Sequence, residues 1–248
     1  LNFRMGRYKD AGGLFLASYE AGSAPDSLVQ AGRAYAAAKD YGEAVKAFNR
    51  YLALDEPPNG KAEVLHSLGY VQSAHGRYNG AAASFQQALS LGAELPAEKL
   101  AAIRIVSAEA YMKTGRAAEA VKVLKAIALG GLPPAGQAPA LMTLGQAYAA
   151  LGDYPASRDA FAKAAGLSGL SGAMRAEIFE SLGYAALSCK DLEMAEAAFR
   201  QALASGSRRV YRIRYALGNA LYQLDRYREA LEQIQASLAG EDIPAAKV

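Results

Sequence analysis

One small residue recurs along most of this chain at nearly constant spacing. The six positions lie 37, 39, 37, 38 and 35 residues apart, and they are Gly32, Gly69, Ala108, Gly145, Gly183 and Gly218. Twelve residues after each of them stands a second small side chain, and four residues later a large apolar one. Self-similarity at such a period is typical of repeat architectures, in which a repeat buries its apolar face only against its neighbours.

A single repeat reads as two short amphipathic helices joined by a tight turn. In the stretch 144–164, LGQAYAALGDYPASRDAFAKA, apolar residues recur three or four positions apart on both sides of the turn. Gly152 can adopt the left-handed conformation that ends a helix, and Pro155 suits the first turn of the next helix. Gly145 is small where the second helix must cross close to the first. The sequence therefore predicts repeated helical hairpins.

The recurring positions carry a more specific signal. A leucine often precedes the small residue, a tyrosine often follows it by three, and the second helix often opens with a tyrosine. This pattern resembles that of the tetratricopeptide repeat family, and the resemblance covers nearly the whole chain. It implies an all-α, right-handed superhelix of antiparallel helix pairs (an α-solenoid), with the first helices lining a concave groove.

The chain departs from the family pattern at several points. The large residue early in the first helix is replaced by Arg104 in the third repeat and by Arg214 in the sixth. Most repeats are also longer than the family's, with extra residues expected in turns or in extended helix starts. Near the beginning, 6–22 matches the second half of a repeat, so LNFR is expected to be the tail of a separate first helix.

We expect one continuous array. Residues 1–24 are the second half of a truncated repeat, 25–244 hold six repeats, and 245–248 are a tail. The expected repeats are 25–61, 62–100, 101–137, 138–175, 176–210 and 211–244. The unpartnered ends suggest a piece of a longer bacterial protein.

The resemblance also indicates where a partner would bind. Groove positions in this family lie one residue after the small residue and two or three before it. The expected partner-binding residues are Gln30, Arg33, His66, Tyr70, Glu109, Met142, Gln146, Glu180, Tyr184, Tyr215, Asn219 and Tyr222. Tyrosines among polar neighbours suit recognition, because a rigid ring and a hydroxyl supply contact area and hydrogen bonds together. For Tyr70 and Tyr184 the alternative is packing against the adjoining repeat. Capture of chaperone tails is not expected, because no consecutive trio here matches the family's carboxylate clamp.

An arginine cluster is the strongest charge feature. Stretch 207–214 with Arg226 and Arg228 holds six arginines against one acid, Asp225. Binding of nucleic acid would require this charge to continue along the groove with stacking aromatics. Because glutamates interrupt the groove, we expect a solvated helix face or a contact to a neighbouring repeat instead, and no nucleic-acid partner.

Nothing in the sequence indicates catalysis. Two histidines and one cysteine, Cys189, lie in no nucleophile or phosphate-loop motif, and Glu63 with His66 supplies only two potential metal ligands. The net charge of +3 favours no class of partner, and no apolar run is long enough to span a bilayer. We expect no enzyme, no metal and no cofactor.

The predicted function is a non-catalytic scaffold that binds a protein, peptide or partner helix in the concave groove. Two alternatives stay open. The array resembles the periplasmic arms of outer-membrane proteins that secrete exopolysaccharide, which would make secretion machinery a partner. It could also be the regulatory arm of an enzyme outside this sequence. The compartment stays open between bacterial cytoplasm and periplasm, and the first alternative favours the periplasm.

Overall fold

The computed structural model describes residues 2–54, 60–92 and 95–239, with side chains from residue 6 onward. These parts of the chain form thirteen α-helices and one short 3₁₀-helix, with no strand among them. The helices are α1 (Asn2–Glu20), α2 (Asp26–Ala37), α3 (Tyr41–Leu52), α4 (Lys61–Ala74), α5 (Tyr78–Leu91), α6 (Ala97–Lys113), α7 (Ala117–Lys125), η1 (Leu129–Gly131), α8 (Pro134–Ala150), α9 (Tyr154–Ala165), α10 (Gly172–Ser188), α11 (Leu192–Ala204), α12 (Val210–Gln223) and α13 (Tyr227–Leu238). The expected all-α fold is confirmed.

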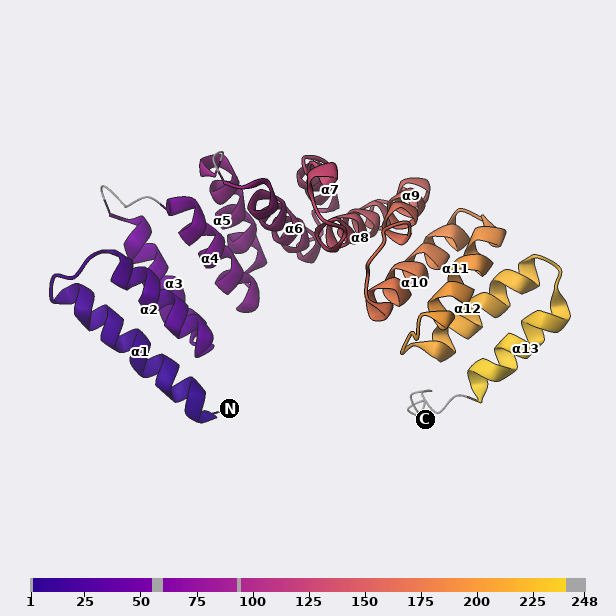
Figure 1. Ribbon diagram of the computed structural model, residues 1–248, viewed down its shortest axis with the longest axis horizontal. Coiled ribbons are helices and arrows are strands. Elements are labelled where there is room, and N and C mark those ends of the chain that lie inside the picture. The colour runs from indigo at the N-terminus through magenta and orange to yellow at the C-terminus, as the bar shows by residue number, and fades with distance from the viewer. Residues whose placement is uncertain (1, 55–59, 93–94, 240–248) are drawn as a thin grey trace. The chain divides into compact units, whose positions relative to one another are not determined.

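The chain divides into two compact units, Leu1–Ala128 and Leu129–Val248. Within each unit every α-helix packs against the next one along the sequence, as Figure 1 shows. In unit 1 the first helices α2, α4 and α6 also contact one another in succession, and in unit 2 α10 contacts α12. Each unit is therefore a series of antiparallel helical hairpins with their first helices side by side.

The recurring small residue lets the two helices of a hairpin approach closely. A Cβ added at Gly32 would lie 2.6 Å from the ring of Phe48, well inside van der Waals contact. The same approach to the second helix recurs at Gly69, Gly145, Gly183 and Gly218. In the third repeat the small residue is Ala108, and its counterpart on the second helix is Leu124 instead of phenylalanine. The repeat signature thus records a steric match across each hairpin.

The turn inside each hairpin places one residue in the left-handed region. Gly152 has φ +77°, as expected, and Pro155 lies in the first turn of α9. Lys39, Lys190 and Asp225 occupy the same turn position with φ between 59° and 61°. These three residues carry a Cβ, so they adopt the left-handed conformation at a steric cost that glycine would not have.

Two features of the local structure differ from expectation. The prediction that LNFR belongs to a separate helix is wrong, because α1 runs without a break from Asn2 to Glu20. It does so through Gly12 and Gly13, and a Cβ at Gly12 would lie 2.9 Å from the ring of Tyr35. The extra residues of the longer repeats lie partly in turns and partly in helix, since α6, α8 and α10 each extend to 17 residues.

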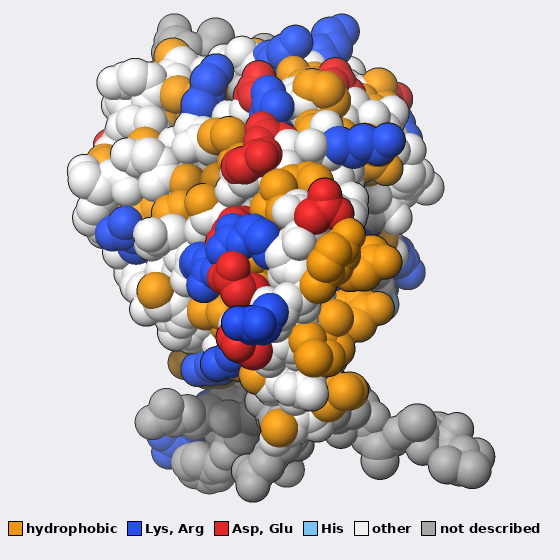
Figure 2. Space-filling view, turned by 90° about the vertical axis from the view of Figure 1, so that its right-hand side faces the viewer, with side chains coloured by type: hydrophobic (Ala, Val, Ile, Leu, Met, Phe, Trp, Pro, Cys, Tyr) orange, Lys and Arg blue, Asp and Glu red, His pale blue; other side chains and the backbone are white. Residues whose placement is uncertain are grey.

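The last helix leaves apolar side chains in solvent. On α13, Tyr227, Leu231 and Leu238 keep 55%, 56% and 67% of their surface exposed. Figure 2 looks onto this end of the molecule and shows hydrophobic side chains gathered beside interleaved cationic and acidic ones.

No helix within the described residues is long and apolar enough to cross a bilayer.

Candidate partner-binding site

The first helices of unit 1 present a surface that combines charged and aromatic side chains. We call this surface, formed by the sides of α2, α4 and α6 that face away from α3, α5 and α7, the first-helix face. Glu63 of α4 forms an ion pair with Lys99 of α6, and this contact holds the pKa of Glu63 below its usual value. Arg33 of α2 lowers that pKa further through its charge. Charge on this face therefore links three successive repeats.

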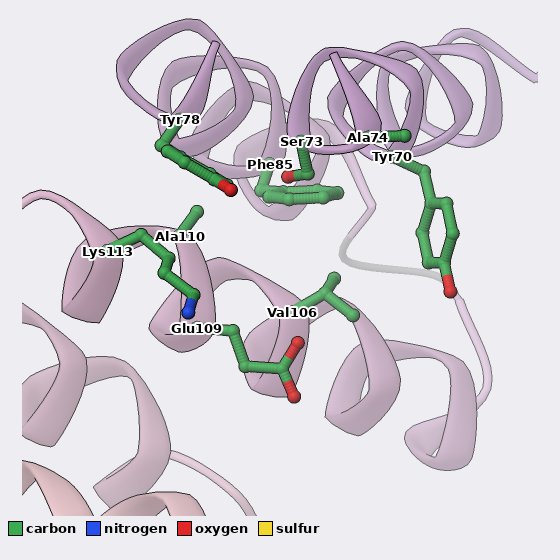
Figure 3. A pocket seen from close by; sticks show the side chains of 9 residues that line it. All are labelled: Tyr70, Ser73, Ala74, Tyr78, Phe85, Val106, Glu109, Ala110 and Lys113. Atoms are coloured by element: carbon green, nitrogen blue, oxygen red, sulfur yellow. The ribbon is translucent and has the colours of Figure 1, made fainter. Parts of the chain in front are cut away.

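A pocket of about 280 Å³ lies between α4, α5 and α6, beside the exposed Tyr70 and Glu109 of the first-helix face. Figure 3 shows the rings of Tyr78 and Phe85 on one side, with Val106 and Ala110 facing them from α6. Its remaining lining residues are Tyr70, Ser73, Ala74, Glu109 and Lys113. Apolar walls with a few polar groups at the mouth are the usual composition of a site that accepts a side chain or small ligand.

The charged groups of this pocket come from one turn of α6. Glu109 and Lys113 are four residues apart and project from the same side of the helix, as Figure 3 shows. Partial burial raises the pKa of Glu109, and the charge of Lys113 opposes that rise. Tyr70, 61% exposed, flanks the pocket from α4. A ligand would thus meet both signs of charge beside an aromatic wall.

His66 lies one turn before Tyr70 on α4. Its ring is 6.4 Å from that of Tyr70, edge to face, and 5.9 Å from that of Phe85. Burial lowers the pKa of His66, the Lys99 charge lowers it further, and Glu63 opposes both. His66 therefore favours its neutral form and packs edge to face with the tyrosine that flanks the pocket.

Of the residues expected in unit 1, the structure brings together His66, Tyr70 and Glu109. Gln30 and Arg33 are exposed on α2, away from the pocket lining. Sequence reasoning missed Tyr78 and Phe85, because they belong to a second helix and reach the pocket through packing. It also missed Lys113, although the spacing of four from Glu109 would have placed it on the same side of α6.

In unit 2 the expected residues divide into buried and exposed groups. Met142 of α8 packs against apolar core residues, whereas Gln146 is exposed. Glu180 of α10 is buried, with 4% of its surface exposed, and its carboxylate accepts a hydrogen bond at 3.3 Å from Arg209. Burial raises the pKa of Glu180 while Arg209 opposes that rise. Glu180 thus has a partner within the fold.

The tyrosines of unit 2 also differ among themselves. Tyr184 is half-buried and packs edge to face on Phe199, with ring centroids 5.2 Å apart. Tyr215 and Tyr222 on α12 are each 61% exposed. Asn219 is exposed between them on α12. Of the tyrosines expected to bind a partner in unit 2, the two exposed ones therefore both lie on α12.

At least half of the arginine cluster has partners within unit 2. Arg209 pairs with Glu177 and Glu180, and Arg226 pairs with Glu196 and Glu229. Arg214 donates a hydrogen bond to Gln233 of α13 at 3.2 Å. These contacts favour a structural role for the cluster over an open cationic surface.

Comparison with known proteins identifies the family. Tetratricopeptide repeat family models match residues 2–60, 73–131, 106–171, 142–209 and 181–246. The chain belongs to the tetratricopeptide repeat family. Such repeats generally act as non-catalytic scaffolds for protein interaction, and among the residues seen in this structure no group of three or more His, Cys, Asp or Glu could hold a metal ion.

Solved structures show the same fold at low sequence identity. The C-terminal part of a repeat protein from Cytophaga hutchinsonii is 15% identical over 95% of this chain and 92% of its own, with a TM-score of 0.70. BtubC from P. vanneervenii is 18% identical, with 84% and 94% covered and a TM-score of 0.63. MamA is 18% identical, with 72% and 91% covered and a TM-score of 0.61. A search of curated proteins gave no match.

Proposed function

We propose that this protein is a scaffold that captures a peptide or a partner helix on the first-helix face of unit 1. The pocket between α4, α5 and α6 is the observation that carries the proposal. It joins aromatic walls to a carboxylate and an ammonium group, and three of the residues expected from the repeat pattern lie at or beside it.

The chemistry of the pocket limits what it would accept. Its volume of about 280 Å³ suits one apolar side chain, which would lie between the ring of Phe85 and the side chain of Val106. Glu109 and Lys113 would then contact polar or charged groups flanking that side chain. Tyr70 would cover the bound segment, because exposed tyrosines contribute contact area at little cost in side-chain entropy.

Peptides selected from a random display library against the protein provide the ligand for a test. We expect Tyr70→Ala and Val106→Asp each to weaken binding of a selected peptide at least tenfold, the loss typical of an interface anchor. Tyr154→Ala is the matched control, since Tyr154 is an exposed tyrosine at the start of a second helix in unit 2.

The measurement is the dissociation constant by fluorescence anisotropy, with circular dichroism to verify that each variant keeps its helical content. Equal loss from Tyr70→Ala and Tyr154→Ala, or no loss from either pocket variant, would refute binding at this face.

A further inference from the structure

A second cavity lies on the other side of α6. It has a volume of about 320 Å³, opens to solvent, and is lined by residues of α5, α6 and α7 and the residues flanking α7, all within unit 1. Its lining residues from α6 are Arg104, Ser107 and Tyr111. At 100° per residue these lie roughly 140° around the helix from the residues that line the first pocket. The cavity is therefore separate from the proposed peptide site.

Two departures from the repeat pattern line this cavity. Where the third repeat has Arg104, four other repeats carry Leu28, Leu65, Leu141 or Phe179. Where it has Ser107, the others carry alanine or leucine. Polar side chains at two positions that are apolar in other repeats reduce the apolar surface that the repeat buries. This loss of stability is offset only if the polar groups form hydrogen bonds or ion pairs.

Neither side chain has a hydrogen-bond or ion-pair partner among the residues that the structure describes. Ser107 has none of its surface exposed, and its Oγ makes no hydrogen bond within the described part of the chain. Ser67, Thr143 and Ser181 by contrast each donate to the carbonyl four residues earlier. Arg104, partly exposed as a residue, likewise forms no ion pair or hydrogen bond with any described residue. A buried hydroxyl without a hydrogen-bond partner, such as that of Ser107, destabilises the fold.

The sixth repeat shows how the fold satisfies an arginine at this position. Arg214 occupies the place of Arg104 and donates to Gln233, which lies 19 residues later on the second helix. The residue 19 positions after Arg104 is Val123, which has no acceptor and lines the cavity. The third repeat thus keeps the arginine without its acceptor and leaves a cavity in front of it.

The other polar side chains that line the cavity either have partners within the protein or carry a positive charge. The guanidinium of Arg116 donates to Glu119 at 2.9 Å and lies 4.7 Å from the ring centroid of Tyr111. The Tyr111 hydroxyl donates to Gln86 at 3.5 Å. Lys122 adds a third positive charge, so the lining carries a net charge of +2, and Leu89, Val123 and Ala126 supply apolar surface.

We propose that this cavity binds a small organic acid. Arg104 presents a planar fork of donors that matches a carboxylate, and Lys122 adds positive charge to the same lining. The hydrocarbon part of the acid lies against Leu89 and Val123. The site is independent of the peptide-binding face, and its occupation gives Arg104 a partner that no described residue supplies.

Titration of the protein with 4-methylpentanoate tests the proposal, with the methyl signals of Leu89 and Val123 followed by NMR. We expect saturable shifts at both residues. The neutral isostere 4-methylpentanamide should bind at least tenfold more weakly, because it lacks the charge that pairs with Arg104. Inorganic phosphate should also bind more weakly, because it has no apolar body. Equal binding of the amide, or no saturable shift with the acid, would overturn the assignment.

Substitutions separate the site from a general effect of charge. Arg104→Gln removes the charge but not the polarity and should weaken binding of 4-methylpentanoate at least tenfold. Arg104→Leu restores the side chain of the other repeats and should abolish binding. Arg214→Leu, the matched control at the equivalent position, should leave the affinity within twofold. The proposal fails if Arg104→Gln binds as the native protein does, or if the dipeptide acid N-acetyl-Leu-Leu binds more tightly than 4-methylpentanoate, which would assign the site to a peptide terminus.

Discussion

The contact between Gly183 and Phe199 provides a quantitative test of why a small residue recurs in this chain. A Cβ added at Gly183 would lie 2.5, 2.7 and 2.8 Å from three carbons of the Phe199 ring. Favourable carbon–carbon contacts lie near 3.5–4.0 Å, and the ring, with no exposed surface, has no free space into which it can move. Gly183→Ala therefore forces the two helices of this hairpin apart.

The expected magnitude follows from two opposing effects. Overpacking of a core typically costs about 1–3 kcal/mol, and contacts this short lie towards the upper end. Alanine gains about 1 kcal/mol over glycine in a helix interior. We therefore expect Gly183→Ala to lower the free energy of unfolding by roughly 1–2 kcal/mol. Gly42→Ala is the matched control, since nothing lies within 4 Å of a Cβ there, and it should raise the free energy by up to about 1 kcal/mol.

A second substitution distinguishes a steric effect from a local effect on the helix. The third repeat already pairs alanine with leucine, at Ala108 and Leu124. Phe199→Leu should therefore relieve the clash of Gly183→Ala, with a favourable coupling of about 1 kcal/mol or more in a double-mutant cycle. Chemical denaturation of the four proteins measures it. Additive effects within 0.5 kcal/mol, or stabilisation by Gly183→Ala equal to that by Gly42→Ala, would refute the steric explanation.

Two further predictions concern backbone strain and a buried charge. Lys190, at φ 59°, holds a left-handed conformation, so Lys190→Gly should raise the free energy of unfolding by about 0.5–1 kcal/mol in thermal denaturation, whereas Gly152→Ala at the equivalent turn should lower it. Arg209→Gln should destabilise the protein by about 1–3 kcal/mol at neutral pH, because the buried Glu180 then loses its partner and must either stay charged or take up a proton. The pKa of Glu180 is higher in the folded protein than its ordinary value of 4.5. The Glu180 carboxyl therefore favours the folded state below pH 4.5, and this contribution to the free energy of unfolding is lost as the pH rises through the folded-state pKa. The effect of Arg209→Gln should accordingly disappear below that pH, and the exposed neighbour Arg208→Gln should show no such dependence in the same pH series.

The hairpins could be predicted from the sequence because their determinants are local and repeated. The small residue and its large counterpart sixteen positions later report a direct contact, as the rings of Phe48 and Phe85 against Gly32 and Gly69 confirm. The extent of the helices could not be predicted as well. Glycine-containing stretches such as that in α1 stay helical because the neighbouring helix packs against them, and this contact is not visible in local propensity.

The candidate site was only partly predictable for a similar reason. Position within a first helix indicates which side chains face away from the hairpin, and Tyr70 and Glu109 do so. It does not indicate whether another repeat supplies a partner. Glu180 is buried because Arg209, 29 residues later, reaches it, and the pocket beside Tyr70 exists because Tyr78 approaches from a second helix.

Arg104 and Arg214 show how function can arise within such an array. The two arginines occupy the same position of two repeats, so the repeat pattern alone assigns them the same role. Their roles differ because of the residue 19 positions later. Gln233 accepts a hydrogen bond from Arg214, whereas Val123 provides only apolar surface near Arg104. A repeat can therefore change from a structural to a ligand-binding arrangement through side chains that leave the helix contacts intact. In this chain the departures from the repeat pattern, compared with one another, identify the positions at which binding should be sought.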